Sequence, residues 1–164
     1  MPITIIPDLQ RGGFILHCEQ RLPAPLEEVF DFFSDACALE SITPPWLNFH
    51  VVTPTPIGIT AGTLIDYKLR MHGIPMRWRS EITVWEPPFR FIDFQRKGPY
   101  RHWEHEHTFR TDNGGTIVGD TVHYSVPGGA LIHRLLVKRD LERIFSYRQQ
   151  TIRQRFAADP ITTS

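Results

Sequence analysis

The sequence predicts one α+β domain in which a curved antiparallel sheet of about seven strands wraps around a long C-terminal helix. Between residues 49 and 127, apolar residues alternate with polar ones and turn signals recur at short intervals, which is typical of consecutive antiparallel strands. After residue 127 the apolar spacing changes to three and four residues, which indicates a helix. Because helices and strands fall into separate blocks, the order argues against a parallel sheet with alternating helices.

The part of the chain before residue 49 predicts one strand and two short helices. Apolar and polar residues alternate from Phe14 to Leu22, as in a half-buried strand. A helix is expected from Pro25 to about Asp35, because proline is favourable at the first position of a helix. A second helix is expected over Ala36 to Ile42 and ends before Pro44, since the residue before a proline avoids the helical conformation.

The rest of the chain predicts six further strands and the long helix. The strands are expected at residues 49–53, 63–71, 74–85, 89–97, 100–110 and 116–126. Asn113-Gly114 is the strongest hairpin signal between them. A helix from about Ala130 to Phe156 would be roughly 40 Å long, enough to lie across one face of such a sheet. Its apolar residues are expected to share one buried face: Leu131, Leu135, Leu141, Phe145, Ile152 and Phe156.

Length and charge limit the kinds of protein that this chain can be. With 164 residues it has room for one domain, which we place at residues 1–164 with its core at about 14–157. The 18 basic and 18 acidic residues cancel, so there is no global positive field to attract phosphate backbones or anionic lipid. We therefore expect no nucleic-acid partner, and the oligomeric state stays open.

Other features favour a soluble, cytoplasmic protein. The first twenty residues lack the basic start, uninterrupted apolar run and small-residue cleavage site of a signal peptide. No segment approaches the ~18 consecutive apolar residues of a membrane span. Cys18 and Cys37 are too few for a disulfide framework, and both are expected to be free thiols in or near the core. The tail, residues 157–164, is expected to fray.

Four short strings point to a known family. They are Ile42-Thr43-Pro44-Pro45-Trp46-Leu47, Gly73-Ile74-Pro75-Met76-Arg77-Trp78, Gly98-Pro99-Tyr100 and Trp103-Glu104-His105-Glu106-His107. With these strings and its order of elements, the chain resembles the START-like superfamily of helix-grip domains, and within it a bacterial subgroup of the polyketide cyclase/dehydrase and lipid-transport type. The resemblance covers nearly the whole chain. It implies the fold and only a class of function, because superfamily members bind hydrophobic ligands, cyclise polyketides or act as protein partners on one scaffold.

The segment from residue 101 to residue 107 is the richest in groups that carry chemistry. On a strand it sends His105 and His107 to the same face as Trp103, and we expect that face to be the concave one. A His-x-His pair can bind a metal, with Asp120 or His123 of the next strand as a third ligand. This spacing alone is a weak signal. We therefore expect neither a metal nor another cofactor, and expect the histidines to line a pocket or to be satisfied in the core.

Acid–base catalysis would need a titratable group inside an apolar cavity. His105, Asp93 and Asp120 are the candidates for such a group near the concave face. The strand that carries Asp93 is ambiguous in parity, because Asp93 and Gln95 compete with their neighbours for the inside. If they face inward, the pocket has a polar end; otherwise they are solvated.

Aromatic residues are the better evidence for a binding site. The aromatics on the more apolar side of their strands are Tyr67, Trp78, Trp103 and Tyr124. Each of them alone can equally be a core residue, but together they suggest a flat, partly unsaturated or aromatic guest. Arg148 is unusual because it lies on the apolar stripe of the long helix, where it must pair with a protein acid, reach the surface or meet a ligand carboxylate.

These observations lead to three functional readings. The first is a binding protein for a small, largely apolar metabolite, with the four aromatics as walls and His105, Gln95 and Arg148 selecting its polar groups. The second is a cyclase/dehydratase-type enzyme that needs no cofactor, in which His105 moves a proton and Asp93 or Asp120 orients it. The third is a protein-interaction module, which predicts a filled cavity and an exposed apolar patch near Trp46 and Leu47.

Overall fold

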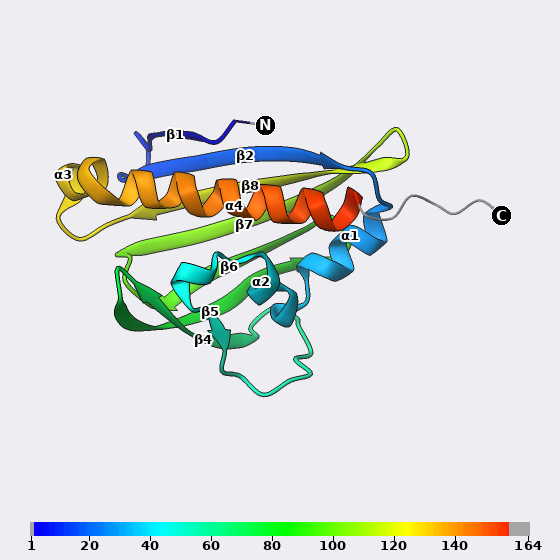
Figure 1. Ribbon diagram of the computed structural model, residues 1–164, viewed down its shortest axis with the longest axis horizontal. Coiled ribbons are helices and arrows are strands. Elements are labelled where there is room, and N and C mark those ends of the chain that lie inside the picture. Colours follow the sequence, from blue (N-terminus) through cyan, green and yellow to red (C-terminus); the bar gives the residue numbers. More distant parts are fainter. Residues whose placement is uncertain (1, 158–164) are drawn as a thin grey trace.

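An eight-stranded antiparallel sheet curves around the C-terminal helix in the computed structural model, which describes residues 2–157 (Figure 1). Its strands are β1 (Thr4–Pro7), β2 (Phe14–Leu22), β3 (His50–Val51), β4 (Leu64–Met71), β5 (Ile74–Glu86), β6 (Arg90–Lys97), β7 (His102–Asp112) and β8 (Gly115–Ser125). They lie in the order β1-β2-β8-β7-β6-β5-β4-β3. The predicted α+β class and its curved sheet are therefore confirmed. Residue 1 and residues 158–164, which include most of the tail expected to fray, lie outside the described residues.

The sheet has one strand more than the roughly seven that the sequence predicted. The eighth strand, β1, pairs with β2 at the edge of the sheet, and the turn between them depends on Asp8. Its Oδ1 accepts hydrogen bonds from the backbone N–H groups of Gln10 and Arg11, both at 3.0 Å. Its Oδ2 lies 2.9 Å from Nδ1 of His123 on β8. A four-residue edge strand held by one side chain produces too short an alternation to be recognised in the sequence.

The two short helices after β2 agree with the prediction. They are α1 (Leu26–Phe33) and α2 (Ala36–Ile42), followed by the 3-10 turn η1 (Pro45–Leu47). Asp35 caps α2 by accepting a hydrogen bond from the backbone N–H of Cys37 at 2.8 Å. Both helices lie beside the C-terminal part of the long helix, on the same side of the sheet (Figure 1).

The long helix forms as expected, but its first turns are rotated relative to the prediction. It consists of α3 (Gly129–Ile132), the π-helical turn η2 (His133–Val137) and α4 (Lys138–Ala157). Leu131 and Leu135, which were expected on the buried face, are 61% and 65% exposed. Leu135 precedes the buried Leu141 by six positions, and this interval places the two side chains on different sides of a helix. His133 takes the inner position instead and bonds to the Tyr124 hydroxyl at 2.8 Å.

The curvature of the sheet agrees with irregularities in β5. The pairing of β5 with β6 shifts register between Arg79 and Ser80 and again between Ile82 and Val84. Such bulges bend a strand and increase its twist. The concave face holds two apolar clusters, one near α1 and one near the first half of α4, and the partly buried Trp78 packs against both. The space between these clusters is where the candidate site lies.

Two further expectations can be checked on the described residues. Cys18 and Cys37 are both free thiols, but only Cys18 is buried, so the expectation that Cys37 lies in or near the core is wrong. Cys37 lies in the first turn of α2, where its neighbour Ala36, and not Cys37, is buried. No helix among residues 2–157 has the length and apolar character that crossing a membrane requires.

The rotation of the long helix predicts unequal effects of two leucine substitutions. Leu141→Ala removes a side chain that is 1% exposed and should lower the free energy of unfolding by about 2–5 kcal/mol. Leu135→Ala, its matched control, should change it by less than about 0.5 kcal/mol because Leu135 is on the surface. Urea denaturation of both variants measures the difference. Equal losses of stability would contradict the orientation of the long helix described here.

Asp8 predicts a pH-dependent contribution to stability. The backbone N–H of Arg11, together with His123, lowers the pKa of Asp8 from 3.8 to about 2. A carboxylate whose pKa is lower in the folded state stabilises the protein above its unfolded pKa of about 4 and loses that contribution as the pH falls toward 2. Asp8→Asn should therefore lower the urea midpoint at neutral pH, and the difference from the wild type should shrink between about pH 4 and pH 2. A difference that stays constant across this range would refute the assignment.

Candidate functional site

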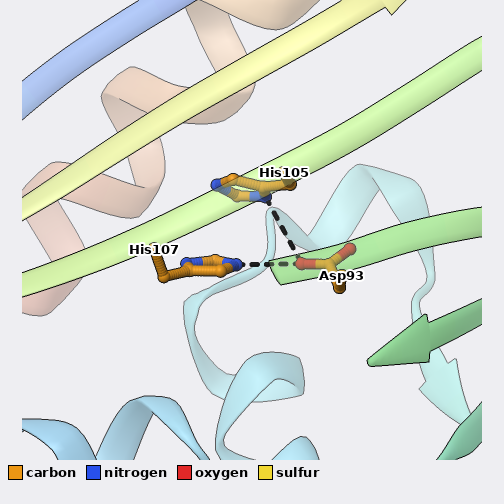
Figure 2. A group of neighbouring side chains, drawn as sticks. All are labelled: Asp93, His105 and His107. Atoms are coloured by element: carbon orange, nitrogen blue, oxygen red, sulfur yellow. Dashed lines mark hydrogen bonds and ion pairs between the residues drawn. The ribbon is translucent and has the colours of Figure 1, made fainter. Parts of the chain in front are cut away.

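A buried polar layer separates the two apolar clusters. It consists of His105 and His107 from β7, Asp120 from β8 and Arg148 from α4, all buried, together with Asp93 from β6, whose side chain is 20% exposed. His105 Nε2 lies 2.8 Å from Asp120 Oδ1, and His107 Nε2 lies 2.9 Å from Asp93 Oδ2. Figure 2 shows the two imidazoles one above the other, both facing the Asp93 carboxylate. Their ring centroids are 3.8 Å apart.

The register of the sheet brings these residues to one level. Asp93 is the cross-strand partner of His105, and Asp120 is the partner of His107. Alternation along β6 sends Asp93 inward, which settles the parity that the sequence left ambiguous. Arg148 reaches the layer from the helix, with its Nη2 atom 3.6 Å from Asp120 Oδ1. Of the fates considered for Arg148, pairing with a protein acid is the one the structure shows.

The groups in this layer shift one another's pKa values. Burial opposes the ionised form of Asp120, but Arg148 and the two histidines outweigh it and hold its pKa well below the usual range. The pKa of Asp93 is also lowered, because His107 and His105 outweigh the effect of burial. His107 shows the opposite balance: burial lowers its pKa, but hydrogen bonds to Asp120 and Asp93 raise it overall. Burial and the neighbouring His107 lower the pKa of His105, so the pKa values of the two imidazoles move in opposite directions.

A cavity of about 190 Å³ opens beside this layer, between the sheet, α4 and the segment from α1 to η1. Five of the seven predicted ligand-binding residues line it: Tyr67, Trp78, Trp103, His105 and Arg148. The Trp78 indole N–H donates to Ser80 Oγ at 3.0 Å, which orients the ring. Burial raises the pKa of the Tyr67 phenol, so its hydroxyl stays protonated. The walls are thus mainly apolar, with both aromatic and aliphatic side chains, and one end is polar.

Two of the predicted ligand-binding residues lie elsewhere. Gln95 is buried but does not line the cavity; its side-chain N–H donates to the backbone carbonyl of Tyr100 at 2.8 Å and so braces the turn between β6 and β7. Tyr124 is buried beyond the cavity wall, where its hydroxyl bonds to His133. Among the predicted catalytic candidates, His105 and Asp93 line the cavity, whereas Asp120 lies behind His105.

Sequence reasoning missed the part of the wall that comes from the helices. Phe33 of α1, Leu39 of α2 and Phe145 of α4 line the cavity opposite the sheet. Their helical spacing marked α1 and α4 as amphipathic but could not distinguish a residue that contacts the sheet from one that faces open space. Phe49, which packs on Tyr67 with ring centroids 4.8 Å apart, was also missed, because it lies between η1 and β3, where no regular spacing assigns its side chain to a face.

The exposed patch predicted for a protein-interaction module is only half present. Trp46 is 48% exposed, with its ring edge-to-face on Tyr147 and beneath the guanidinium of Arg143. Leu47 is buried instead and lines the cavity, because η1 turns it inward. The cavity that this reading expected to be filled is open.

Comparison with known proteins identifies the family. The sequence profile of the polyketide cyclase / dehydrase and lipid transport family matches residues 22–152. The chain therefore belongs to this family, as the resemblance of its sequence motifs suggested. The family suggests binding of a hydrophobic ligand and does not specify which one. No curated protein matched the chain.

Solved structures confirm the helix-grip fold. A Mycobacterium smegmatis protein is 19% identical, with 96% of this chain and 99% of that chain covered and a TM-score of 0.72. An Arthrobacter aurescens protein is 12% identical, with 96% and 92% covered and a TM-score of 0.73. Ara h 8.0201 is 13% identical, with 88% and 98% covered and a TM-score of 0.66. At such identities the likeness concerns the fold alone.

The buried layer predicts a large loss of stability when its balance is broken. Asp120→Asn keeps the shape of the side chain but leaves the positive charge of Arg148 without its buried partner, which should lower the free energy of unfolding by about 3–5 kcal/mol. The matched control is Asp112→Asn, which removes a partner of Arg21 in a half-exposed pair and should cost less than about 1 kcal/mol. Urea denaturation at neutral pH compares the two. Equal losses would show that the layer contributes no more than a surface pair.

Proposed function

We propose that this protein binds a small, flat, largely apolar molecule in the cavity between its sheet and α4. The observation that carries this proposal is the composition of the wall, in which Tyr67, Trp78 and Trp103 surround an open space instead of packing it shut. Aromatic faces stabilise flat guests by stacking and by edge-to-face contacts. Membership of a family that includes lipid transport supports the same class of ligand.

The size of the cavity supports a small guest. Its volume of about 190 Å³ lies below the roughly 300–1,000 Å³ that is usual for pockets of drug-sized ligands. A molecule of one or two fused rings matches this space better than a fatty-acid chain or a large polyketide. We therefore expect the guest to be aromatic or partly unsaturated and rigid.

The polar end of the cavity supports selection of one oxygen-bearing group on the guest. Asp93 and the protonated hydroxyl of Tyr67 are available at the wall, whereas both nitrogens of His105 already face carboxylates. A hydroxyl or carbonyl group directed toward them would be hydrogen-bonded, while the rest of the guest contacts aromatic rings. Arg148 contributes less to this selection, because it already pairs with Asp120.

The enzyme reading has less support from the geometry. Both ring nitrogens of His105 already face carboxylates, with Nε2 bonded to Asp120 and Nδ1 3.8 Å from Asp93. A general base needs a free nitrogen within hydrogen-bond reach of its substrate. The cyclase/dehydratase alternative therefore remains a prediction that needs a turnover assay.

A cytoplasmic location likewise remains a proposal, supported by the two free thiols.

Binding of 1-naphthol, a two-ring phenol, tests the proposed function. Isothermal titration should show saturable binding, with a negative heat-capacity change that reports burial of apolar surface. Ile65→Phe adds bulk to a residue that lines the cavity and should weaken this binding at least tenfold. As a second measurement, freshly purified protein is denatured, and mass spectrometry should detect a small molecule released at one per chain.

The matched control is Leu64→Phe. Leu64 precedes Ile65 on β4 but points to the opposite face of the sheet, where it is 47% exposed. This variant should bind 1-naphthol like the wild type. Absence of saturable binding, together with absence of a co-purifying molecule in several expression hosts, would overturn the proposal. Equal weakening by both variants would place the bound naphthol outside the cavity.

A further inference from the structure

We propose that Asp93, His105 and His107 form a binding site for one divalent transition-metal ion, open to the cavity (Figure 2). This proposal departs from the sequence-based expectation of no metal. Sequence reasoning considered the His105–His107 pair with a third ligand from β8, either Asp120 or His123. In the structure the third ligand, the carboxylate of Asp93, comes from β6, which lies on the other side of β7.

The three donor atoms already lie close to the separation that a metal requires. Asp93 Oδ2 is 2.9 Å from His107 Nε2 and 3.8 Å from His105 Nδ1. All three atoms lie within 4.8 Å of one another. Zinc bonds of about 2.0–2.1 Å in tetrahedral geometry place neighbouring donors roughly 3.3–3.4 Å apart. Small movements of these side chains would therefore bring the three atoms around one ion.

Asp120 faces the far nitrogen of both histidines. Its Oδ1 atom lies 2.8 Å from His105 Nε2 and 3.2 Å from His107 Nδ1. Protons on these two nitrogens leave the lone pairs of His105 Nδ1 and His107 Nε2 directed toward Asp93. Metal-binding histidines usually donate their second N–H group to a carboxylate in this way, which orients the ring. Arg148 in turn balances the charge of Asp120.

The geometry around His107 suits either a second proton or a cation. Without an ion, a doubly protonated His107 donates to both Asp120 and Asp93. With a proton on Nδ1 alone, facing Asp120, two acceptors oppose each other 2.9 Å apart at Nε2 and Asp93 Oδ2. A cation between them takes the place of the second proton, so metal binding at this position releases a proton.

The donor set restricts the kind of ion. Two imidazoles and one carboxylate are typical of catalytic zinc sites and of mononuclear ferrous sites, whereas Mg²⁺ and Ca²⁺ prefer oxygen ligands alone. Asp93, His105 and His107 all line the cavity, so the remaining coordination positions face it. Water would occupy one of them. An oxygen of the bound guest could replace this water, a step that rests on the proposed function.

Titration of chelator-treated protein with ZnCl₂ at neutral pH tests the site without any organic ligand. Calorimetry should show saturation at one ion per chain, and CoCl₂ should produce the visible absorption of a cobalt ion bound by nitrogen and oxygen. His107→Gln and Asp93→Asn should each abolish this binding. Asp120→Asn, where it stays folded, should weaken it about 10- to 100-fold, because it removes only the orienting carboxylate.

The matched control is His17→Gln. His17 lies on the exposed side of β2 and bonds to Thr121, so its loss should leave zinc binding unchanged. Circular dichroism and thermal melting establish that each variant is folded. The proposal is overturned if wild-type protein binds neither zinc nor cobalt at one ion per chain, or if folded His107→Gln binds as the wild type does. Because 1-naphthol is titrated into metal-free protein, failure of either proposal is distinguishable from failure of the other.

Discussion

The arrangement of side chains in the interior of this protein depends on the ion pairs of one buried carboxylate, that of Asp120. It links the sheet to the C-terminal helix through Arg148, and it holds His105 and His107 on the neighbouring strand. A charge at this depth is tolerated only when it is paired, because the cost of removing it from water is several kcal/mol. The pairing therefore restricts how α4 can rotate and slide on the sheet.

This layer also explains why the interior contains a cavity. The inner face of β7 reads Trp103, His105, His107 and Phe109, so polar groups interrupt the apolar face at the middle of the strand. Apolar side chains pack on either side of the interruption, in two separate clusters. Among the aromatic rings beside it, that of Trp78 is held by its hydrogen bond to Ser80 and lines the open space.

The family and the site answer different questions. Membership of the polyketide cyclase / dehydrase and lipid transport family establishes the fold and suggests a hydrophobic ligand. The chemistry of the cavity belongs to this chain, because one scaffold carries several functions in such families. A small apolar space, lined partly by aromatic rings and ending at two imidazoles and a carboxylate, favours a rigid guest with one oxygen-bearing group. The same donors make this end suitable for a metal ion.

The sequence alone determined the order of the elements, the antiparallel sheet and the parity of β7, because alternation and turn signals are local properties. It did not reveal β1, whose turn depends on the contact between Asp8 and His123, 115 positions apart in the chain. Nor could it orient the first turns of the long helix or the side chain of Asp93. Tertiary structure decided these features, because each depends on which residues become neighbours after folding: His133 on Tyr124, and Asp93 on His107. The site lies where β6, β7, β8 and α4 come together, and no local pattern in the sequence predicts these contacts.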